Sequence, residues 1–306
     1  MIQRVIDLIY RYPKSYLKRI NSFGGLLAYR KMLHGEKEMI VSAFRLKPIT
    51  SFDNGLPVYF LTGKKYIHQT IFCIHSLKKV SKEKFSFTLV DDGSFDKDII
   101  EKINAIIINC KIITTEQIEE NVEEILPKTT FPTIHKKRAE YAHIKKLTDI
   151  HTLPHTRDFK LVLDSDMLFW KEPKEIIEWL KEPNKPIHMI DCVEAYGYTI
   201  ELMQKLTKST IKEKINVGAL GLNSSNINWI ALEEWISQME LEEGTSYFLE
   251  QALSAMLIGN RNSITLSETD YIVNPNKQDT NGLAGVLHHY VDLSKAFYYQ
   301  TAWKKL

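Results

Sequence analysis

Apolar residues along this chain of 306 residues are grouped in two alternating patterns. Short, nearly continuous apolar runs are typical of strands buried on both faces of a sheet, and they occur at residues 57–63, 85–93, 110–115 and 159–168. Longer segments with apolar residues every three or four positions are typical of helices, and they occur at residues 66–80, 95–106, 133–151 and 173–182. Because the two kinds alternate, we predict an α/β fold with a mostly parallel central sheet.

The two ends of the chain are less regular. In the second half we predict strands at residues 185–197 and 215–225, helices at 227–239 and 244–258, and a closing segment at 285–299. Residues 2–32 have a helical pattern that Pro13 and the pair Gly24-Gly25 interrupt. The turn-forming stretch "DNGLPV" then precedes the regular part of the chain. We therefore predict a helical extension at residues 1–54 and one α/β domain at residues 55–306.

The charge distribution separates the same two regions. Residues 1–50 contain ten Lys or Arg and three Asp or Glu, a net charge of +7, whereas the whole chain has only +2. This basic arm begins with a cluster of apolar side chains, Ile2, Val5, Ile6, Leu8, Ile9 and Tyr10. A basic amphipathic segment can lie on an anionic membrane surface. Alternatively, the arm packs as a helical extension on the main domain or on a second copy in a homodimer. We expect no nucleic-acid partner.

The three cysteines narrow the class of protein further. Cys73, Cys110 and Cys192 lie far apart and form no C-x-x-C pair, which argues against a disulfide framework and against a zinc site. No apolar run approaches the roughly 18 residues of a membrane span. Charges at Arg4 and Asp7 interrupt the N-terminal apolar segment, which is therefore unlike a signal peptide. We expect a cytoplasmic protein, peripheral at the inner face of the membrane if the basic arm binds lipid.

The stretch "FKLVLDSDMLFW" at residues 159–170 places two carboxylates in an apolar run. Burial of unpaired carboxylates is unfavourable, so a cation is expected beside them. In an extended chain Asp164 and Asp166 point to the same side, where they suit Mg²⁺ or Mn²⁺. Such an ion can in turn bind a diphosphate. The competing interpretation is a turn at the end of a strand in which one aspartate caps the next segment.

Other strand ends carry polar residues that could contact a bound nucleotide. Ligands of parallel α/β sheets bind beyond the carboxyl ends of the strands. Asp91-Asp92, in "LVDDGSFD", lies at such an end, although Asp-Gly is also an ordinary turn sequence. The basic residues of the helix at 133–151 could neutralise a diphosphate. The candidates for donor binding are Asp91, Asp92, Thr62, Lys145, Asn216 and Gly218.

Two further pairs are candidates for chemistry. His288 and His289 are adjacent, so only one of them can face a site in an extended segment, and an imidazole among oxygen ligands favours Mn²⁺. Glu250 and Gln251 lie early in a predicted helix, where the carboxylate could act on an acceptor or stabilise positive charge at a sugar. The competing interpretation of Glu250 is an acid that favours the helix N-terminus.

Taken together, these motifs resemble the GT-A nucleotide-sugar glycosyltransferases. The order of "LVLDSDMLF", "NVGALGLN", "EQALSAM" and "LHHY" is similar to that of retaining members of the glycogenin and bacterial galactosyltransferase type. The "DDGS" element is closer to the large inverting family that includes chitin and cellulose synthases. The retaining type ends in His-x-x-Gly-x-x-Lys-Pro-Trp, whereas this chain has "HHYVDLSKAF", without that glycine.

The resemblance implies a three-layer αβα fold that transfers a sugar from a nucleoside-diphosphate sugar. It implies that Asp164 and Asp166 hold Mn²⁺ or Mg²⁺ and that His288 or His289 completes the metal site. Asp91 or Asp92 would contact the nucleoside, and residues 55–306 would form the catalytic domain. The nucleotide, the sugar and the acceptor (a glycan, a lipid or a small molecule) do not follow from these motifs.

Three alternatives fit parts of the pattern. A haloacid-dehalogenase-type phosphatase also uses Asp-x-Asp at a strand end, but it places this motif on its first strand and wants Thr or Val where Met167 stands. A sugar-nucleotide pyrophosphorylase would have a Gly- and Arg/Lys-rich loop after the first strand, which "LTGKKY" matches poorly. A catalytically inactive GT-A domain that binds sugar nucleotides as a scaffold fits all the motifs.

Overall fold

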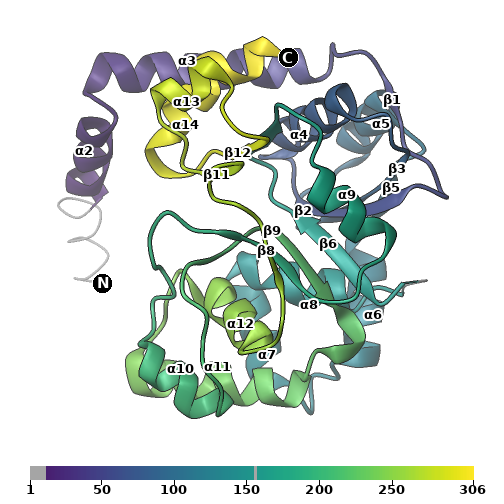
Figure 1. The fold of residues 1–306 in the computed structure, drawn as a ribbon, viewed down its shortest axis with the longest axis vertical. Coiled ribbons are helices and arrows are strands. Elements are labelled where there is room, and N and C mark those ends of the chain that lie inside the picture. The colour runs from purple at the N-terminus through teal and green to yellow at the C-terminus, as the bar shows by residue number, and fades with distance from the viewer. Residues whose placement is uncertain (1–11, 155–156) are drawn as a thin grey trace.

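A seven-stranded sheet forms the centre of the molecule in the computed structural model, which describes residues 12–154 and 157–306 (Figure 1). Its strands lie in the order β10 (Ile264–Thr265), β8 (Ile187–Ile190), β9 (Ile215–Asn223), β6 (Phe159–Leu163), β2 (Leu56–Thr62), β3 (Phe85–Asp91) and β5 (Lys111–Ile113). Only β9 is antiparallel to its neighbours β6 and β8. The prediction of a mostly parallel central sheet is confirmed.

Helices cover both faces of this sheet, because the strands are apolar on both sides. Side chains of β2 show the alternation: Val58 and Phe60 belong to the core on one face, and Tyr59 and Leu61 pack against the core on the other. The first core includes α4 (Ile67–Val80), α5 (Lys97–Ile106) and α9 (Lys174–Lys181). The second includes α6 (Thr115–Ile125), α7 (Pro132–Glu140), α8 (Lys145–His151), α10 (Ile200–Thr207), α11 (Trp229–Glu243) and α12 (Leu249–Ile258).

Two predicted elements are broken in the structure. The strand predicted at 159–168 ends at Leu163, turns through Asp164, Ser165 and Asp166, and resumes as β7 (Met167–Phe169). β7 belongs to a second sheet with β12 (Leu287–His289) and β11 (Tyr271–Val273). The helix predicted at 133–151 is interrupted by Tyr141, whose backbone is extended, and by a 3₁₀ turn (Ala142–Ile144) before α8.

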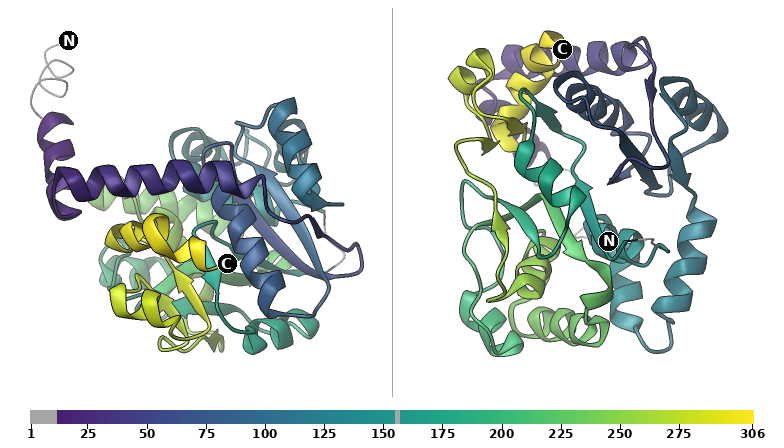
Figure 2. Two further views of the ribbon diagram at one scale, coloured as in Figure 1. Left: turned by 90° about the horizontal axis from the view of Figure 1, so that it is seen from above. Right: turned by 45° about the vertical axis from the view of Figure 1, so that its right-hand side comes forward.

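Two helices precede the sheet at the N-terminal end, and Figure 2 shows α3 crossing the molecule from α2. α2 (Tyr12–Ser22) and α3 (Leu26–Ala43) are joined through Gly24 and Gly25, whose φ angles of 86° and 94° suit glycine. α3 packs on the C-terminal segment so closely that a Cβ on Gly35 would lie 2.1 Å from the carbonyl oxygen of Tyr299. The apolar residues that begin the predicted basic arm, Ile2 to Tyr10, lie outside the described residues.

Short elements complete the described chain. β1 (Ile49–Thr50) pairs in parallel with β4 (Ile107–Ile108). After β9 comes a 3₁₀ turn (Ser224–Asn226), and the C-terminal part contains α13 (Lys277–Gly282), a 3₁₀ turn (Asp292–Ser294), α14 (Lys295–Phe297), η5 (Tyr298–Ala302) and η6 (Trp303–Lys305). Among residues 12–154 and 157–306, no helix is both long enough and apolar enough to span a bilayer.

Candidate active site

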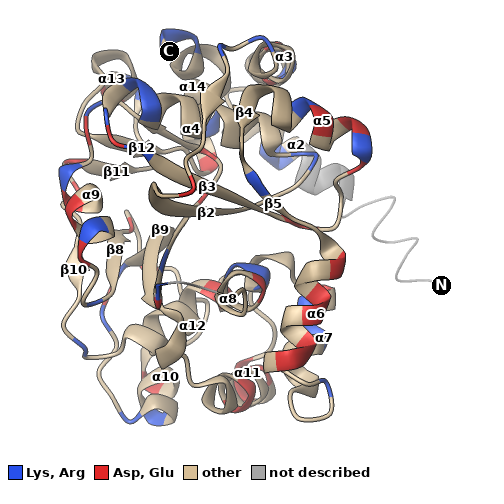
Figure 3. Cartoon of the chain, turned by 90° about the vertical axis from the view of Figure 1, so that its right-hand side faces the viewer, with Lys and Arg blue, Asp and Glu red and all other residues tan. Residues whose placement is uncertain are grey.

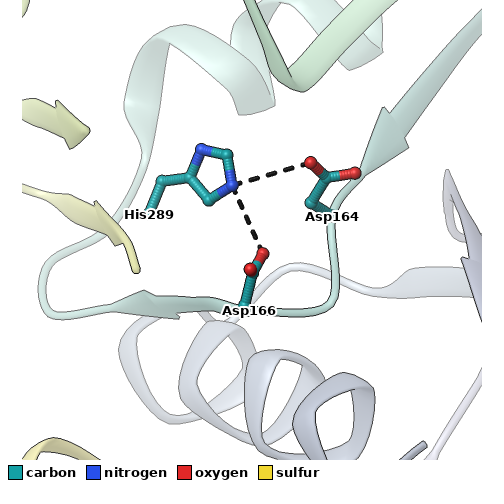
Figure 4. A group of neighbouring side chains, drawn as sticks. All are labelled: Asp164, Asp166 and His289. Carbon is teal, nitrogen blue, oxygen red and sulfur yellow. Dashed lines mark ion pairs between the residues drawn. The ribbon is translucent and has the colours of Figure 1, made fainter. Parts of the chain in front are cut away.

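Two aspartates and a histidine meet where β6, β7 and β12 join (Figure 4). β12 pairs antiparallel with β7, and this register puts His289 opposite Met167, the residue that follows the D-x-D turn. His289 Nε2 lies 3.6 Å from Asp164 Oδ2 and 3.3 Å from Asp166 Oδ1. One ligand atom of each residue lies within 4.8 Å of the others, which is a suitable spread for one divalent cation. The carboxylates converge because of a turn, and not because of the strand alternation expected from the sequence.

Hydrogen bonds of Asn216 determine the tautomer of His289. Asn216 Oδ1 accepts the backbone N–H of Gly218 at 3.0 Å and lies 3.1 Å from His289 Nδ1, while its Nδ2 donates to Asp191 Oδ2 at 2.9 Å. Because the amide oxygen can only accept, His289 Nδ1 must carry the hydrogen of this pair. His289 Nε2 in the neutral ring therefore presents its lone pair to the two aspartates, as a metal ligand does.

Gly218 leaves the space that this histidine ring occupies. A Cβ on Gly218 would lie 2.5 Å from ring atoms of His289 and 2.6 Å from the terminal methyl of Met167. From the sequence we named Gly218 as a candidate for donor binding. The close approach in the structure is that of the His289 ring.

His288 points to the other side of β12, as the alternation of side chains requires. Its Nδ1 lies 3.0 Å from the hydroxyl of Tyr290 and its Nε2 lies 2.7 Å from the carbonyl oxygen of Ala284. Burial lowers the pKa of His288 to about 4, so the ring is neutral. The sequence left open which of the two histidines faces the metal site, and in the structure His289 faces the aspartates.

Two lysines supply positive charge to the aspartates. Lys295 forms an ion pair with Asp166, and Lys146 lies 3.0 Å from Asp164 Oδ1 and 3.1 Å from Glu250 Oε2. Burial opposes ionisation of Asp166, but the Lys295 ammonium outweighs it and holds the pKa of this carboxyl well below its usual range. Burial also disfavours the charged form of Lys146, and Asp164 and Glu250 together raise the pKa of this lysine above its usual value.

The predicted catalytic pair is also buried near this cluster. Burial, only partly offset by Lys146, raises the pKa of Glu250 to about 7. Glu250 Oε1 accepts a long hydrogen bond of 3.4 Å from Ser254. Gln251 donates to Asp191 Oδ2 at 3.2 Å, and Asp191 also accepts from Asn216. Asp191 connects the predicted catalytic pair to the His289 network, although we did not predict it from the sequence.

Asp191 had a sequence signal of its own. It follows β8 directly, in "IHMIDC", just as Asp164 follows β6. β8 and β6 are both antiparallel to β9 and so run in the same direction. The rule that placed Asp91 and Asp164 at the ligand edge therefore applies equally to Asp191.

Lys295 could also have been found from the sequence. Counted from His289, the pattern His-x-x-Gly-x-x-Lys places Asp292 at the glycine and Lys295 at the lysine. Asp292 has a φ angle of 44°, the left-handed backbone that a glycine adopts without strain. Counted this way the chain keeps the lysine, and Asp292, Ala296 and Phe297 stand where the motif has Gly, Pro and Trp.

Asp91 and Asp92 were both candidates for donor binding, but their surroundings differ. Asp91 is buried, and its Oδ1 accepts the backbone N–H groups of Gly93, Ser94 and Phe95 at 3.0, 3.0 and 3.1 Å. Its Oδ2 accepts the hydroxyl of Thr115 at 3.2 Å. These bonds agree with the alternative interpretation of the motif, an ordinary Asp-Gly turn. They leave the partly exposed Asp92 as the member of the pair that is open to a donor.

The remaining donor-binding candidates border the same edge. The hydroxyl of Thr62 lies 2.8 Å from that of Thr70, which lies 2.8 Å from the hydroxyl of Ser165 in the D-x-D turn. This chain of hydroxyls ties the end of β2 to the turn. Lys145 donates to the carbonyl oxygen of Asp92 at 3.0 Å. In Figure 3, lysines and acids are seen where α8 approaches the strands.

Similar architectures occur among solved structures, although no family model and no curated protein matches the chain. The galactosyltransferase LgtC, in complex with donor and acceptor sugar analogs, is 15% identical, with a TM-score of 0.55 over 82% of this chain and 96% of that chain. Mouse xyloside xylosyltransferase 1, in its apo form, is 12% identical, with a TM-score of 0.52 over 79% of this chain and 97% of that chain.

The chain has the GT-A glycosyltransferase fold. An active-site mutant of LgtC matches it as well, at 16% identity and a TM-score of 0.51 over 77% of this chain and 87% of that chain. At these identities the likeness concerns the fold, and it confirms the fold class expected from the motifs. A haloacid-dehalogenase-type phosphatase has no support in this architecture.

Proposed function

We propose that this protein is a metal-dependent glycosyltransferase that uses a nucleoside-diphosphate sugar. The observation that carries the proposal is the convergence of Asp164, Asp166 and His289 at the carboxyl edge of a GT-A sheet. The neighbouring structures include a galactosyltransferase and a xylosyltransferase, so the fold supports sugar transfer without specifying the sugar.

The donor set fits Mn²⁺ or Mg²⁺. Asp164, Asp166 and the Nε2 of His289 would hold the ion, and a nitrogen among oxygen ligands favours Mn²⁺. Bound there, the ion would stabilise negative charge on the departing nucleoside diphosphate. Asn216 would hold His289 in the tautomer that this role needs.

The lysines beside the aspartates would bind the donor. Lys295 and Lys146 lie against Asp166 and Asp164, so both ammonium groups are within reach of a diphosphate held at this cluster. The partly exposed Asp92 would face the nucleoside, with Thr62 and Lys145 shaping that end of the site. Asn216 holds the His289 ring and Gly218 leaves space for it, so both would shape the part of the site that holds the sugar.

Glu250 and Gln251 would act on the sugar. Glu250 is held by Lys146, and Gln251 is held by Asp191, so both side chains are fixed before a substrate arrives. The Glu250 carboxylate would stabilise positive charge that develops at the sugar or would place the acceptor. The acceptor would be a glycan, a lipid or a small molecule.

A specific observation also favours a competing function. Because Lys295 and Lys146 already neutralise the two aspartates, the cluster could serve as a structural ion-pair network in an inactive GT-A scaffold that binds sugar nucleotides. Donor hydrolysis distinguishes the two. We expect hydrolysis of at least one nucleoside-diphosphate sugar that requires Mn²⁺ or Mg²⁺ and stops with a chelator.

A thermal-shift screen of nucleoside diphosphates, with and without Mn²⁺, would identify the nucleotide at the same time. We expect the metal and the nucleotide to stabilise the protein more together than either does alone. If a nucleotide stabilises the protein equally with and without the metal, and no donor is hydrolysed, the scaffold function is supported instead.

A further inference from the structure

A cavity that none of Asp164, Asp166 and His289 lines lies between α3 and the first turns of α4 and α5. Its volume is about 720 Å³, and it borders the loop that follows β2. The floor of this α3–α5 groove is apolar and is formed by Leu33, Ile40, Phe44, Ile67 and Ile99. In Figure 2, α3 is seen running across the molecule beside the helices that follow β2 and β3.

The packing of α3 explains only part of the apolar floor. This helix has one buried stripe, Tyr29, Met32, Met39 and Ala43, which attaches it to the body of the protein. Leu33, Ile40 and Phe44 form a second stripe at helical spacing, in which Leu33 and Phe44 are half-buried and also pack against the core. Ile40 is 41% exposed, so the groove keeps an apolar side chain that another apolar molecule can contact.

The rim of the groove is strongly basic. Five cationic side chains line it, Arg30, Lys37, Lys64, Lys65 and Lys102, against the two acids Glu36 and Asp98. Lys64 pairs with Asp96, and Lys102 pairs with Asp98. Within residues 12–154 and 157–306, Arg30, Lys37 and Lys65 form no ion pair with a carboxylate. The uncompensated charge calls for an anionic partner.

A buried histidine adds a polar group to this cavity. His68 lines the groove, is 2% exposed, and its Nε2 has no hydrogen-bond partner among the described residues. Burial, together with the nearby Lys295, lowers the pKa of His68 to about 4, so the ring stays neutral. A neutral, unpartnered imidazole can exchange a hydrogen bond with a hydroxyl or phosphate oxygen.

We propose that the α3–α5 groove binds an anionic phospholipid of a membrane surface. The lipid phosphate meets Arg30, Lys37 and Lys65 at the rim, and an acyl chain lies along the second stripe of α3. From Arg30 to Phe44 the helix extends about 21 Å, which accommodates much of an acyl chain. Exposed leucines at the start of α3, Leu26 at 47% and Leu27 at 82%, extend the apolar surface.

An anionic lipid explains both halves of the groove at once. A soluble anion would satisfy the basic rim and leave the exposed Ile40 without a role. A second protein chain would cover the apolar floor but would need an acidic face to match the rim. The proposal is independent of the sugar-transfer function. The loop after β2 contributes Lys64 and Lys65 to the groove, and the N–H of Lys64 donates to Ser94 in the turn that follows Asp92. A membrane bound at the groove would therefore lie near the donor edge.

Vesicle flotation of the intact protein tests the proposal. The two vesicle types are phosphatidylcholine alone and phosphatidylcholine mixed with phosphatidylglycerol, and we expect binding to the mixed vesicles only. The double variant Arg30→Glu with Lys37→Glu should lower the partition coefficient by at least about tenfold, since each basic residue near an anionic surface contributes on the order of that much. A matched control, Lys31→Glu with Arg45→Glu, makes the same charge change on exposed residues that do not line the groove.

The outcomes separate the groove from general charge attraction. An equal loss of binding in both double variants would reject the groove, because only net charge would then matter. Binding that inorganic phosphate abolishes would indicate a soluble-anion site, and failure to float with mixed vesicles would also reject the proposal. Ile40→Ser keeps the rim intact and should remove the part of the binding that survives high salt. Circular dichroism and thermal unfolding of each variant check that the chain is folded.

Discussion

Two acidic turns lie at the same edge of the sheet, but their carboxylates have different kinds of partner. Asp91, at the end of β3, is bound by three backbone N–H groups of its own turn and by the hydroxyl of Thr115. Asp164 and Asp166, after β6, are neutralised by lysines that come from elsewhere in the chain, Lys146 and Lys295. The sequences "VDDGS" and "LDSDM" look equally suited to a ligand.

The difference lies in what compensates the carboxylates. Local backbone groups cannot leave Asp91 without unfolding the turn, so that carboxylate is committed to the structure. The partners of Asp164 and Asp166 are side chains of other segments, so a metal ion would compete with those side chains and not with the backbone of the turn. A strand-end acid is therefore a better ligand candidate when its partners are side chains from elsewhere in the chain than when its own backbone binds it.

Replacement of the D-x-D carboxylates should have the largest effect. Asp164→Asn or Asp166→Asn keeps the volume of the side chain but removes the charge that holds the metal. We expect sugar transfer or donor hydrolysis to fall by more than about a hundredfold, since even partners outside the ligand set contribute ten- to a hundredfold. Activity assays with Mn²⁺ and thermal unfolding together check this outcome. A variant that kept near-normal, metal-dependent turnover would contradict the metal role of these aspartates.

The matching change in the other turn should affect stability instead. Asp91→Ala removes the acceptor of the Gly93 and Phe95 N–H groups and one of the two acceptors of the Ser94 N–H, so we expect a loss of about 1–3 kcal/mol in the free energy of unfolding. Urea denaturation measures it. Mn²⁺ affinity of the folded fraction should stay within a fewfold of that of the unmodified protein. A large loss of nucleotide affinity without a loss of stability would give Asp91 a donor-binding role after all.

The support of His289 should have an intermediate effect. Asn216→Ala removes the acceptor that holds the Nδ1 hydrogen of His289, and Mn²⁺ affinity should fall by roughly ten- to a hundredfold. Calorimetric titration of Mn²⁺ with a nucleoside diphosphate measures this affinity. Asn223, in the same strand, serves as the control for an asparagine outside the network: Asn223→Ala should leave Mn²⁺ affinity unchanged. Equal losses in both variants would point to damage of β9 as a whole.

The smallest expected effect concerns the pH dependence of Glu250. Its pKa of about 7 in the folded protein exceeds its ordinary value, so the folded state binds more protons than the unfolded state between about pH 4.5 and 7. The contribution of Glu250 to stability is thus greatest below pH 4.5 and declines by at most a few kcal/mol as the pH rises to 7. The neighbouring Lys146 limits this decline.

Glu250→Gln should remove this pH-dependent part in metal-free protein. The difference in stability between the unmodified protein and the variant, followed by thermal unfolding from pH 4.5 to 7.5, should change steadily in that window. In the active enzyme the same variant should lower kcat with little effect on donor affinity. A kcat that the variant leaves unchanged would return Glu250 to the role of an acid that begins a helix.

Much of this fold could be predicted from local pattern. The continuous apolar runs and the period-3.6 segments identified β2, α4, β3, α5 and α9 within a few residues, because each element buries its own apolar side chains. The division of the chain at residue 54 stays a prediction. α3 lies in the predicted extension, yet its residues Met32 and Met39 belong to the core of the main domain. Membrane contact, a homodimer and the cytoplasmic location also stay predictions.

The sequence by itself determined which residues could form a site: the strand-end aspartates, the histidine pair, Glu250 and Gln251. Only the tertiary structure decided among them. The antiparallel pairing of β12 with β7 brings His289, and not His288, to the aspartates. Lys295 and Asp191 join through contacts with residues that lie 25 to 129 positions away in the chain. The physical reason is that a residue's tendency to form a strand or a turn is a local property, whereas the partner of a buried charge depends on which distant segments the packed sheet brings together.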